Sequence, residues 1–466
     1  MQNLVQVREI SYCDPLAAFS LFSEQPYALF LDSAQITDRL GRYSFIAIDP
    51  FLTMTSKNGQ ILLGQKKMQG NPFEILKAQL DQYAITHRSG LPPFQTGVAG
   101  YFGYDLGHHL EVLPQAHLDD MEFPDLILGF YDVVIAFDHL QHRAWIFSSG
   151  YPESDEPKRR KRAHSRAQEI EDKLNHAPAI PDTPQPAEQP TTIKSNYTNR
   201  ESYEDAVQQV IDYIYAGDIF QANLSQRFEA QLPIQDSPFK LYRRLRTINP
   251  APFAAYLNFE NVVIASASPE RFLLLRDNWI ETRPIKGTRP RGTTTESDQQ
   301  YAAALLGSEK DRAENVMIVD LLRNDLSRVC QDHTVKTPEI CALESYATVH
   351  HLVSTIEGQL KPGRTAIDLL QATFPGGSIT GAPKIRAMEI IAELEPTQRG
   401  PYCGSVGYIS FSGDMDTSII IRTYAIKENR VTFQAGGGIV ADSSPAAEYD
   451  ETIDKARALM HALGTH

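Results

Sequence analysis

Cysteine and long apolar runs are both scarce in this chain. Its 466 residues include four cysteines, Cys13, Cys330, Cys341 and Cys403, and no CxxC pair. Their spacings fit neither a zinc site nor a disulfide framework, so free thiols in a reducing compartment are expected. No apolar run approaches the roughly 18 residues that cross a membrane, and the first residues lack the layout of a signal peptide. The sequence therefore predicts a cytoplasmic protein without a membrane span.

Positive charge is also in deficit. The chain has 44 Lys and Arg against 58 Asp and Glu, a formal net charge of -14. This balance argues against a general affinity for nucleic acid or anionic membranes, although a local pocket can still be positive. One basic run, KRRKR at 158–162, opens a predicted helix over 158–176. Because no aromatic residues are interleaved there to stack bases, a solvent-exposed helix joining two parts of the fold is favoured over a nucleic-acid site.

Three regions follow one another along the chain, without an internal repeat. Residues 1–150 are rich in predicted strands, 151–195 hold the basic helix and a Pro-rich linker at 177–195, and 196–466 carry the segments with chemical character. The length allows two or three modest domains or one large interwoven α/β body. The predicted strands include 27–33, 42–50, 132–139, 254–260, 262–268, 271–277, 418–426 and 431–440, and the predicted helices include 73–83, 199–216, 308–329 and 443–463.

Two loop segments bring in a glutamate and a lysine. Glu270 ends an apolar strand in SPERF (268–272), and Lys286 lies in the Pro- and Gly-flanked segment RPIKGTRPRG (283–292). The two could face each other across a β-hairpin. A lysine held in a closed pocket loses hydration and can act as a nucleophile, and a partly buried glutamate beside it can act as a general acid or base. Taken alone, the segment also fits a surface loop with four cations.

Carboxylates recur at helical spacing in two predicted helices. Glu314 lies on the helix at 308–329, where a second carboxylate three residues earlier shares its face. In the C-terminal helix, Glu448, Glu451 and Lys455 fall at i, i+3 and i+7 on one face. Hard oxygen ligands presented in this way suit Mg²⁺, which keeps several waters. A solvated acidic face and a simple Glu–Lys helix pair are the competing interpretations.

Glycines and one arginine mark possible anion sites. The Gly-rich turn in PGGSITGAP (375–383) runs into a helix whose free N–H groups could hold an anion, although it does not match a Walker A loop. Arg422 interrupts the apolar run SIIIRTYAI, and a buried charge there needs either a structural carboxylate or a substrate carboxylate. Gly436, Gly437 and Gly438 would let a backbone approach a ligand closely.

Each of these signals also fits a purely structural role. Taken together they describe a pocket with a Mg²⁺ site, an arginine that grips a carboxylate, Gly-rich anion loops and a Lys–Glu pair. Such a set predicts a small substrate that carries two negative charges.

These segments, in this order, resemble the chorismate-utilising enzymes, a family that includes the anthranilate, aminodeoxychorismate, isochorismate and salicylate synthases. The likeness covers about residues 196–466, and FLDSA (30–34) with GRYSFIAIDP (41–50) extends it more loosely into the N-terminal region. The resemblance implies an α/β (α+β) fold, in which two antiparallel sheets pack together as one large interwoven body with helices outside.

Two positions sort the branches of this family. The isochorismate and salicylate synthases carry a lysine base where this chain has Gln221, as the aminating branch does. Anthranilate synthases have Ala where PIKGT has Lys286. A lysine at this position, together with NPAPF at 249–253, resembles the pattern of the aminodeoxychorismate synthases. The implied reaction is the Mg²⁺-dependent amination of chorismate at C4 with ammonia. Anthranilate synthase component I is the alternative, and it leaves Lys286 unexplained.

The resemblance also implies roles for the matched residues. Lys286 attacks C2 of chorismate, Glu270 protonates the departing C4 hydroxyl, and His351 is the family's active-site histidine. The implied Mg²⁺ ligands are Glu314 and Glu451, with Glu448 close by. The residues implied to line the substrate pocket are Thr288, Tyr408, Arg422, Gly436, Gly438 and Lys455, with Arg422 holding the enolpyruvyl carboxylate.

Partners follow from the same resemblance. The chain shows no glutaminase triad, so a separate glutamine amidotransferase subunit or dissolved ammonium is expected to supply ammonia, and another enzyme is expected to complete 4-aminobenzoate. The segment FLDSA resembles the one that forms a tryptophan effector pocket in anthranilate synthases. The resemblance implies that Ser33 could line such a pocket. A non-catalytic anchor for a glutaminase is a rival from another class, and the completeness of the motif set argues against it.

Overall fold

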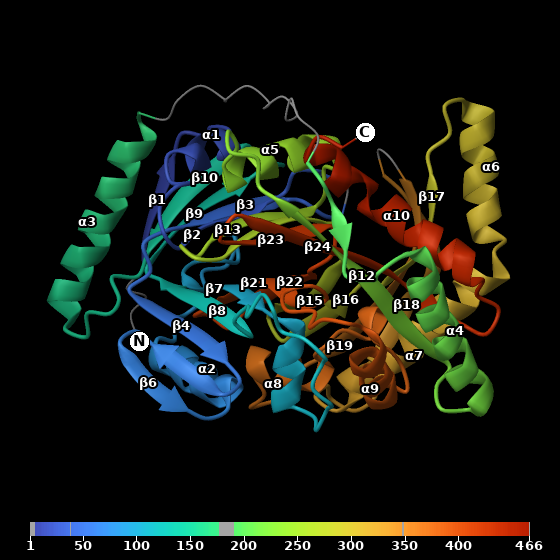
Figure 1. Cartoon of the computed structure of the whole chain (residues 1–466). Coiled ribbons are helices and arrows are strands. Elements are labelled where there is room, and N and C mark those ends of the chain that lie inside the picture. Colours follow the sequence, from blue (N-terminus) through green and yellow to red (C-terminus); the bar gives the residue numbers. More distant parts are fainter. Residues whose placement is uncertain (1–4, 38, 177–190, 347–348, 466) are drawn as a thin grey trace.

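The strands of this chain form two large antiparallel sheets that lie face to face (Figure 1). The computed structural model describes residues 5–37, 39–176, 191–346 and 349–465. Residues 177–190 of the predicted linker lie outside the described residues. The two packed sheets with helices outside confirm the predicted α/β body.

The first sheet has twelve strands, in the order β1-β10-β9-β3-β2-β13-β14-β23-β24-β12-β11 with β20 paired to β12. Its strands are β1 (Gln6–Ile10), β2 (Ala28–Asp32), β3 (Tyr43–Ala47), β9 (Val133–Asp138), β10 (Arg143–Ser148), β11 (Lys194–Ser195), β12 (Gln221–Gln231), β13 (Phe253–Asn258), β14 (Val263–Ser268), β20 (Gly381–Ala382), β23 (Thr423–Lys427) and β24 (Arg430–Ile439). The N-terminal and C-terminal regions join where β2 pairs with β13 and Phe30 lies opposite Tyr256.

The second sheet also has twelve strands, in the order β17-β19-β16-β15-β22-β21-β7-β8-β4-β5-β6 with β18 paired to β19. Its strands are β4 (Leu52–Lys57), β5 (Gln60–Leu63), β6 (Lys66–Gln69), β7 (Gly97–Phe102), β8 (Leu126–Tyr131), β15 (Arg271–Arg276), β16 (Trp279–Thr282), β17 (Ile285–Pro290), β18 (Lys336–Ser345), β19 (Val349–Gln359), β21 (Ser405–Ser410) and β22 (Met415–Ile419). Here β7 pairs with β21, so both sheets interweave the two regions.

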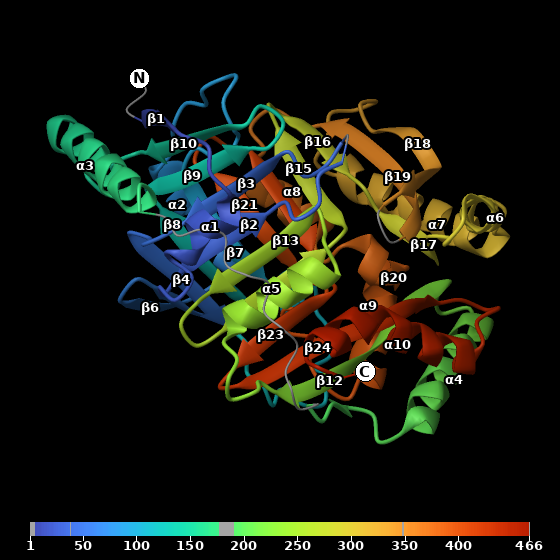
Figure 2. The same cartoon turned by 90° about the horizontal axis from the view of Figure 1, so that it is seen from above.

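Helices cover the outer faces of the sheets (Figures 1 and 2). They are α1 (Pro15–Ser20), α2 (Pro72–Gln82), α3 (Glu156–Leu174), α4 (Arg200–Ala216), α5 (Pro238–Ile248), α6 (Thr295–Leu306), α7 (Glu309–Ser327), α8 (Ala366–Thr373), α9 (Lys384–Leu394) and α10 (Pro445–Ala462), with short 3-10 helices η1 (Tyr104–His109) and η2 (Gly377–Ile379). Helices α1, α3, α5 and α10 pack on the first sheet, and α2, α7 and α8 pack on the second. Of the described helices, none is both long and apolar enough to span a bilayer.

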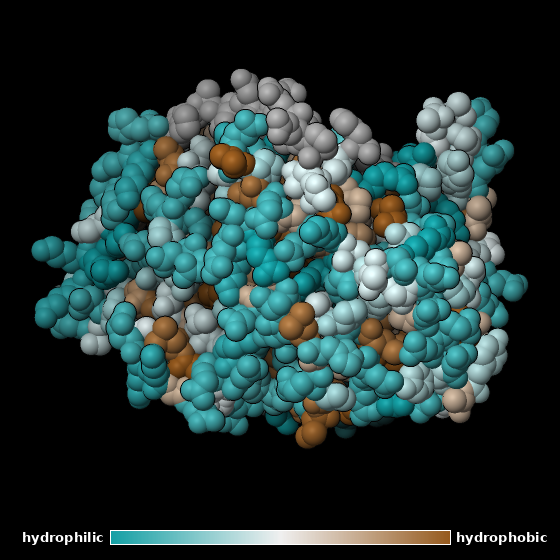
Figure 3. Space-filling model, in the orientation of Figure 1, coloured by the Kyte–Doolittle hydropathy of each residue, from teal (hydrophilic) through white to brown (hydrophobic). Residues whose placement is uncertain are grey.

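Apolar side chains on both faces of the central strands build separate cores. On β2, Leu29 points into the core between the sheets, whereas Phe30 points outward to the helices of the first sheet. This period-2 alternation with both faces apolar is typical of strands buried on both sides. The face of the molecule in Figure 3 is in contrast mostly hydrophilic, with apolar residues in small separate groups.

Two arginines of the basic run at the start of α3 form ion pairs with carboxylates of the same chain. Arg162 pairs with buried Asp132 at 3.2 Å, and Arg160 pairs with Glu156 one turn earlier at 2.7 Å. The other face of α3 buries Ala163, Ala167, Ile170 and Leu174 against the first sheet. These contacts give the run a structural role.

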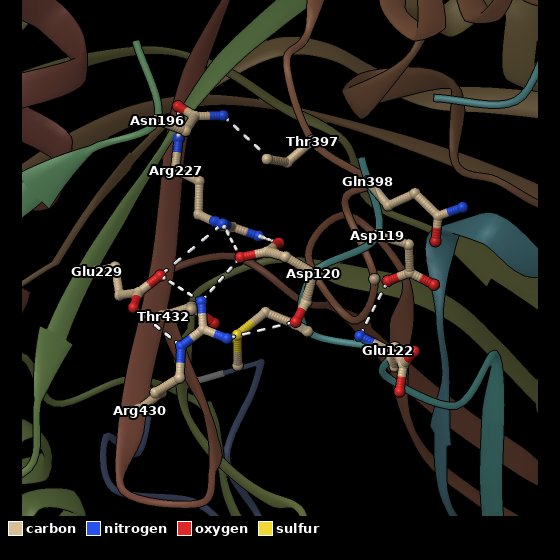
Figure 4. Close-up of polar contacts among 12 residues, drawn as sticks. Asp119, Asp120, Glu122, Asn196, Arg227, Glu229, Thr397, Gln398, Arg430 and Thr432 are labelled. Atoms are coloured by element: carbon tan, nitrogen blue, oxygen red, sulfur yellow. Dashed lines mark hydrogen bonds and ion pairs between the residues drawn. The ribbon is translucent and has the colours of Figure 1, made fainter. Parts of the chain in front are cut away.

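A polar network ties a loop of the N-terminal region to the C-terminal region (Figure 4). Asp120, in the connection between η1 and β8, accepts hydrogen bonds from Arg227 on β12 and Arg430 on β24, each at 2.7 Å. Arg430 also binds Glu229 at 2.8 Å. Partial burial acts to raise the pKa of Asp120, but the two arginines outweigh it and hold the pKa at about 2.

Asp120→Asn is expected to lower the free energy of unfolding by about 1 kcal/mol at pH 7, after discounting for the solvent exposure of the pair. The pKa of Asp120 is depressed in the folded protein. The carboxylate therefore makes its full contribution to the free energy of unfolding above about pH 4, the pKa of an unfolded aspartate. This contribution is lost as the pH falls through about 2. Urea denaturation at pH 7 and pH 3 measures this. Asp332→Asn, in a loose exposed pair 3.9 Å from Lys361, is the control, and an equal loss at both pH values would contradict the assignment.

Candidate functional site

Eleven of the twelve residues predicted for substrate, metal and catalysis line one cavity of about 1430 Å³. They are Glu270, Lys286, Thr288, Glu314, His351, Arg422, Gly436, Gly438, Glu448, Glu451 and Lys455. Seen from above, β17 and α7 stand on one side of this region, and β24 with α10 stands on the other (Figure 2). The cavity thus lies between elements of the two sheets, and it draws side chains from segments far apart in the sequence.

Lys286 is held by a carboxylate inside this cavity. It lies on β17, is 9% exposed, and its Nζ is 2.6 Å from Glu314 Oε1 on α7. The same oxygen accepts a hydrogen bond from Gln221 Nε2 at 2.6 Å. The other side-chain atom of Gln221, Oε1, is buried and has no hydrogen-bond partner among the described residues. An acceptor is therefore available beside the Lys–Glu pair.

Glu270 is a buried carboxyl in the same cavity. It is 4% exposed and accepts a hydrogen bond from Ser378 on η2 at 2.6 Å. Burial raises the pKa of Glu270 to about 7, although the hydrogen bond from Ser378 and the charge of Lys286 act in the opposite direction. A carboxyl with this pKa can both donate and accept a proton near neutral pH.

The sequence suggested that Glu270 and Lys286 could face each other across a β-hairpin. In the structure they do not. Strand β15, which follows Glu270, pairs with β16 and β22, whereas β17 pairs with β19. The connection before Lys286 instead turns back to the cavity, where the backbone of Ile285 forms a hydrogen bond with Glu270.

A bulge in β17 precedes Thr288, which lies opposite His351 of β19. The register between β17 and β19 shifts between Lys286 and Thr288, where Gly287 has a φ of +76°. A Cβ atom at Gly287 would lie 3.0 Å from that of Asp311, so both the conformation and the space require glycine. Thr288 Oγ1 and His351 Nδ1 are 2.9 Å apart. Burial, aided by the charge of Arg422, lowers the pKa of His351 to about 4, so the ring is neutral at neutral pH.

Arg422 lies where the chain passes from one sheet to the other. The run 418–426, predicted as a single strand, ends β22 of the second sheet at Ile419 and begins β23 of the first at Thr423. Arg422, with a φ of 54°, donates from Nη1 to the carbonyl of Lys455 at 2.7 Å. Within the described chain it makes no ion pair with a carboxylate, and burial lowers its pKa. It is therefore free to bind an anionic group of a ligand.

Three carboxylates converge on the glycines of β24. A Cβ atom at Gly437 would lie 3.0 Å from Glu448 Oε2 and 3.4 Å from Glu451 Oε1, and one at Gly438 would lie 2.2 Å from Glu314 Oε1. In the described ranges no three His, Cys, Asp or Glu side chains form a group that could hold a metal ion alone. Mg²⁺ does not need such a group, because it takes one or two carboxylates and keeps several waters. The donor set therefore fits a hydrated Mg²⁺.

Tyr408 is the exception among the predicted residues. It lies on β21 in the core between the sheets, where its ring stacks on Phe94 with centroids 4.5 Å apart. It faces a second cavity of about 690 Å³ and does not line the cavity of Lys286, so its predicted place is wrong. Tyr402, in the turn before β21, lines the first cavity instead. Ser33 lines the second cavity, as its predicted role requires.

Three residues of the first cavity were missed by sequence reasoning. Ser378 lies in the Gly-rich turn, which was interpreted as a backbone anion site, and its hydroxyl instead binds Glu270. Tyr402 precedes Tyr408 by six residues, and pattern alone does not distinguish them. Lys310 lies one helical turn before Glu314, so the spacing of i and i+4 could have placed it on the same face of α7.

This chain is similar to known proteins over nearly its whole length. The family model for chorismate binding enzymes matches residues 26–461. Aminodeoxychorismate synthase component 1 of Escherichia coli is 41% identical over 451 residues, 96% of this chain and 95% of that protein. Anthranilate synthase component 1 of Thermus thermophilus is 40% identical over 452 residues, again 96% and 95%. The crystal structure of anthranilate synthase component I from Streptococcus pneumoniae superposes with a TM-score of 0.79 at 34% identity, covering 91% of this chain and 94% of that one.

Proposed function

The chain belongs to the chorismate-binding enzymes, and we propose that within this family it is an aminodeoxychorismate synthase. It replaces the C4 hydroxyl of chorismate with an amino group from ammonia, giving 4-amino-4-deoxychorismate for 4-aminobenzoate and folate synthesis. The observation that carries the proposal is Lys286, a nearly buried amine in the cavity that also contains Glu270 and Arg422. The alternative, anthranilate synthesis, leaves a nucleophile at this position without a role.

The proposed chemistry consists of two allylic displacements. As the neutral amine, Lys286 bonds through Nζ to C2 of chorismate while both ring double bonds shift and the C4–O bond breaks, and Glu270 gives its proton so that water leaves. Ammonia then bonds to C4, both double bonds shift back, and the C2–N bond breaks to release the lysine. The ionised Glu270 takes up the surplus proton of the new amine. The balance is chorismate plus ammonia giving 4-amino-4-deoxychorismate plus water.

The remaining residues of the cavity bind and orient the substrate in this proposal. Arg422 pairs with the enolpyruvyl carboxylate, helped by backbone amides near Gly436 and Gly438. Neutral His351, oriented by Thr288, donates or accepts a hydrogen bond without adding charge. Lys455, which donates to the Gly436 carbonyl at 2.8 Å, helps to hold the glycine strand in place.

Magnesium is part of the proposal through the carboxylates beside β24. Glu314 and Glu451 would hold the ion, and Glu448 would act through water. Bound Mg²⁺ supplies positive charge against the ring carboxylate of chorismate. Ammonia is proposed to come from a glutamine amidotransferase subunit, consistent with the designation of the similar E. coli protein as a component 1.

A product assay tests the proposal. The purified chain is incubated with chorismate, Mg²⁺ and ammonium at alkaline pH, and the products are separated by chromatography. The expected product is 4-amino-4-deoxychorismate, without pyruvate. Release of anthranilate and pyruvate would leave the family and the cavity intact but would replace the proposed reaction with the alternative one.

The second cavity is proposed to bind tryptophan. It is lined by Ser33 together with Phe253, Arg271 and Tyr408, which offer an apolar wall and charged groups for an amino acid. Tryptophan is expected to bind the isolated chain, and Ser33→Leu is expected to weaken this binding at least about tenfold by filling the cavity. Equilibrium binding measures both. Lys286→Ala, in the other cavity, is the control, and absence of binding at millimolar tryptophan contradicts the proposal.

A further inference from the structure

Three lysine ammonium groups stand opposite the three carboxylates of the proposed metal site. Lys286 is 2.6 Å from Glu314, Lys455 is 2.5 Å from Glu451, and Lys310 is 3.2 Å from Glu448. The first lysine has the proposed nucleophilic role, and the second also binds a backbone carbonyl. The proposed reaction has assigned no role to Lys310, although it lines the same cavity.

Lys310 occupies a position on α7 that its own helix disfavours. It is in the first turn, where the helix dipole and the unpaired N–H groups repel a positive charge. Glu448 Oε1 on α10 lies 3.2 Å from its Nζ and opposes this repulsion. The attraction that holds this ammonium in place therefore comes from a carboxylate on another helix.

Lys310 is the most exposed of the three lysines and is far more exposed than its own partner. The side chain of Lys310 is 46% exposed, against 31% for Lys455 and 10% for Lys286, whereas that of Glu448 is 4% exposed. The carboxylate is thus fixed in the protein interior, where Ser443 also donates to it at 2.6 Å. The lysine reaches it from the solvent side on a flexible four-carbon stem. It can leave the cluster without breaking any packing in the core.

We propose that Lys310 is a tethered counter-ion of the metal-binding carboxylates, which it neutralises in the metal-free protein and which it must leave when a divalent cation binds. The inference rests on the proposed function in one respect, namely that Glu314, Glu448 and Glu451 form the metal site. The lysine then sets metal affinity by competition. In the metal-free state it also prevents the buried Glu448 from being left as an unpaired charge, which would be costly.

The experiment is a calorimetric titration of the metal-free full chain with Mg²⁺, in the absence of chorismate. Lys310→Met keeps the length of the stem and removes the charge. This variant is expected to bind Mg²⁺ about three- to tenfold more tightly than the unsubstituted chain, because the competing ion pair and the repulsion of the incoming cation both disappear. Without metal, in a chelator, its melting temperature is expected to fall by about 1–2 °C.

Two matched variants complete the design. Lys310→Arg keeps the charge and is expected to bind Mg²⁺ no more tightly than the unsubstituted chain. Lys361→Met makes the same change of net charge at a loose surface pair with Asp332 and is expected to change neither quantity.

An unchanged or weaker Mg²⁺ affinity in Lys310→Met would overturn the inference, and so would an unsubstituted chain that binds no Mg²⁺. These outcomes are independent of the product assay. If the titration behaves as expected but the assay yields anthranilate, the counter-ion stands and the proposed reaction fails.

Discussion

Lys286→Ala is expected to form 4-amino-4-deoxychorismate at least about 10³-fold more slowly than the unsubstituted chain, because removal of a covalent nucleophile eliminates the whole route that it opens. The amine is the one group in the described cavity that is proposed to bond to C2. Its loss should appear in kcat, since Arg422 and the Gly-rich strand, which are proposed to bind the substrate, are unchanged. Chromatographic product assays at saturating chorismate and ammonium measure the change.

A second variant separates nucleophilicity from charge. Removal of Lys286 also leaves Glu314 without the ammonium 2.6 Å away, so lost activity could in principle reflect a disturbed metal site. Lys286→Arg keeps a positive charge beside Glu314, but a guanidinium does not lose its proton in proteins and so cannot attack carbon. We expect the Arg variant to be as inactive as the Ala variant, with near-normal Mg²⁺ affinity. An Arg variant that keeps more than about a tenth of the rate would show that Lys286 acts through its charge.

The helices of the site follow from local sequence rules. Helix α7 begins after Ser308, whose side chain accepts a hydrogen bond from the Asp311 N–H, and its 3.6-residue period turns Glu314 toward the cavity. The same period presents Glu448 and Glu451 together on α10. Cap and period depend only on residues within a few positions of one another, so a single sequence is enough to predict them.

The parts that the sequence did not reveal depend on contacts between distant segments. The run SIIIRTYAI is apolar on both sides of Arg422, and periodicity cannot show that its halves enter different sheets, since both halves are buried. For the same reason Tyr402 and Tyr408 look alike in sequence, although Tyr402 lines the cavity of Lys286 and Tyr408 lies in the core between the sheets. Lys310 resembles an ordinary surface lysine until α10 is placed beside α7.

Glu270→Gln is expected to slow turnover by about 10²–10⁴-fold, the usual contribution of a general acid. The amide has nearly the same shape and can still accept the hydrogen bond from Ser378, which is 2.6 Å long in the unsubstituted chain. It has no proton to give to the departing C4 hydroxyl. We therefore expect kcat to fall while chorismate binding, measured directly by calorimetry, changes little. A variant with near-normal turnover would remove Glu270 from the proton transfer.

The pH dependence gives an independent test of the same residue. Burial raises the pKa of Glu270 to about 7, so the protonated form that the first displacement needs declines as the pH rises through 7. The kcat/KM of the unsubstituted chain, compared at a fixed concentration of unprotonated ammonia, should show this limb, and the residual rate of Glu270→Gln should not.

The Glu270→Gln substitution should lower activity without lowering the free energy of unfolding. The pKa of Glu270 rises from about 4.5 in the unfolded chain to about 7 in the folded chain. The folded state therefore loses stability as the pH rises through this range, because the buried carboxyl must then ionise. Glu270→Gln removes that cost, so we expect the variant to equal or exceed the stability of the unsubstituted chain at pH 8 in urea denaturation. An inactive variant that is no less stable cannot owe its inactivity to unfolding, which places the loss in the chemistry of the carboxyl itself.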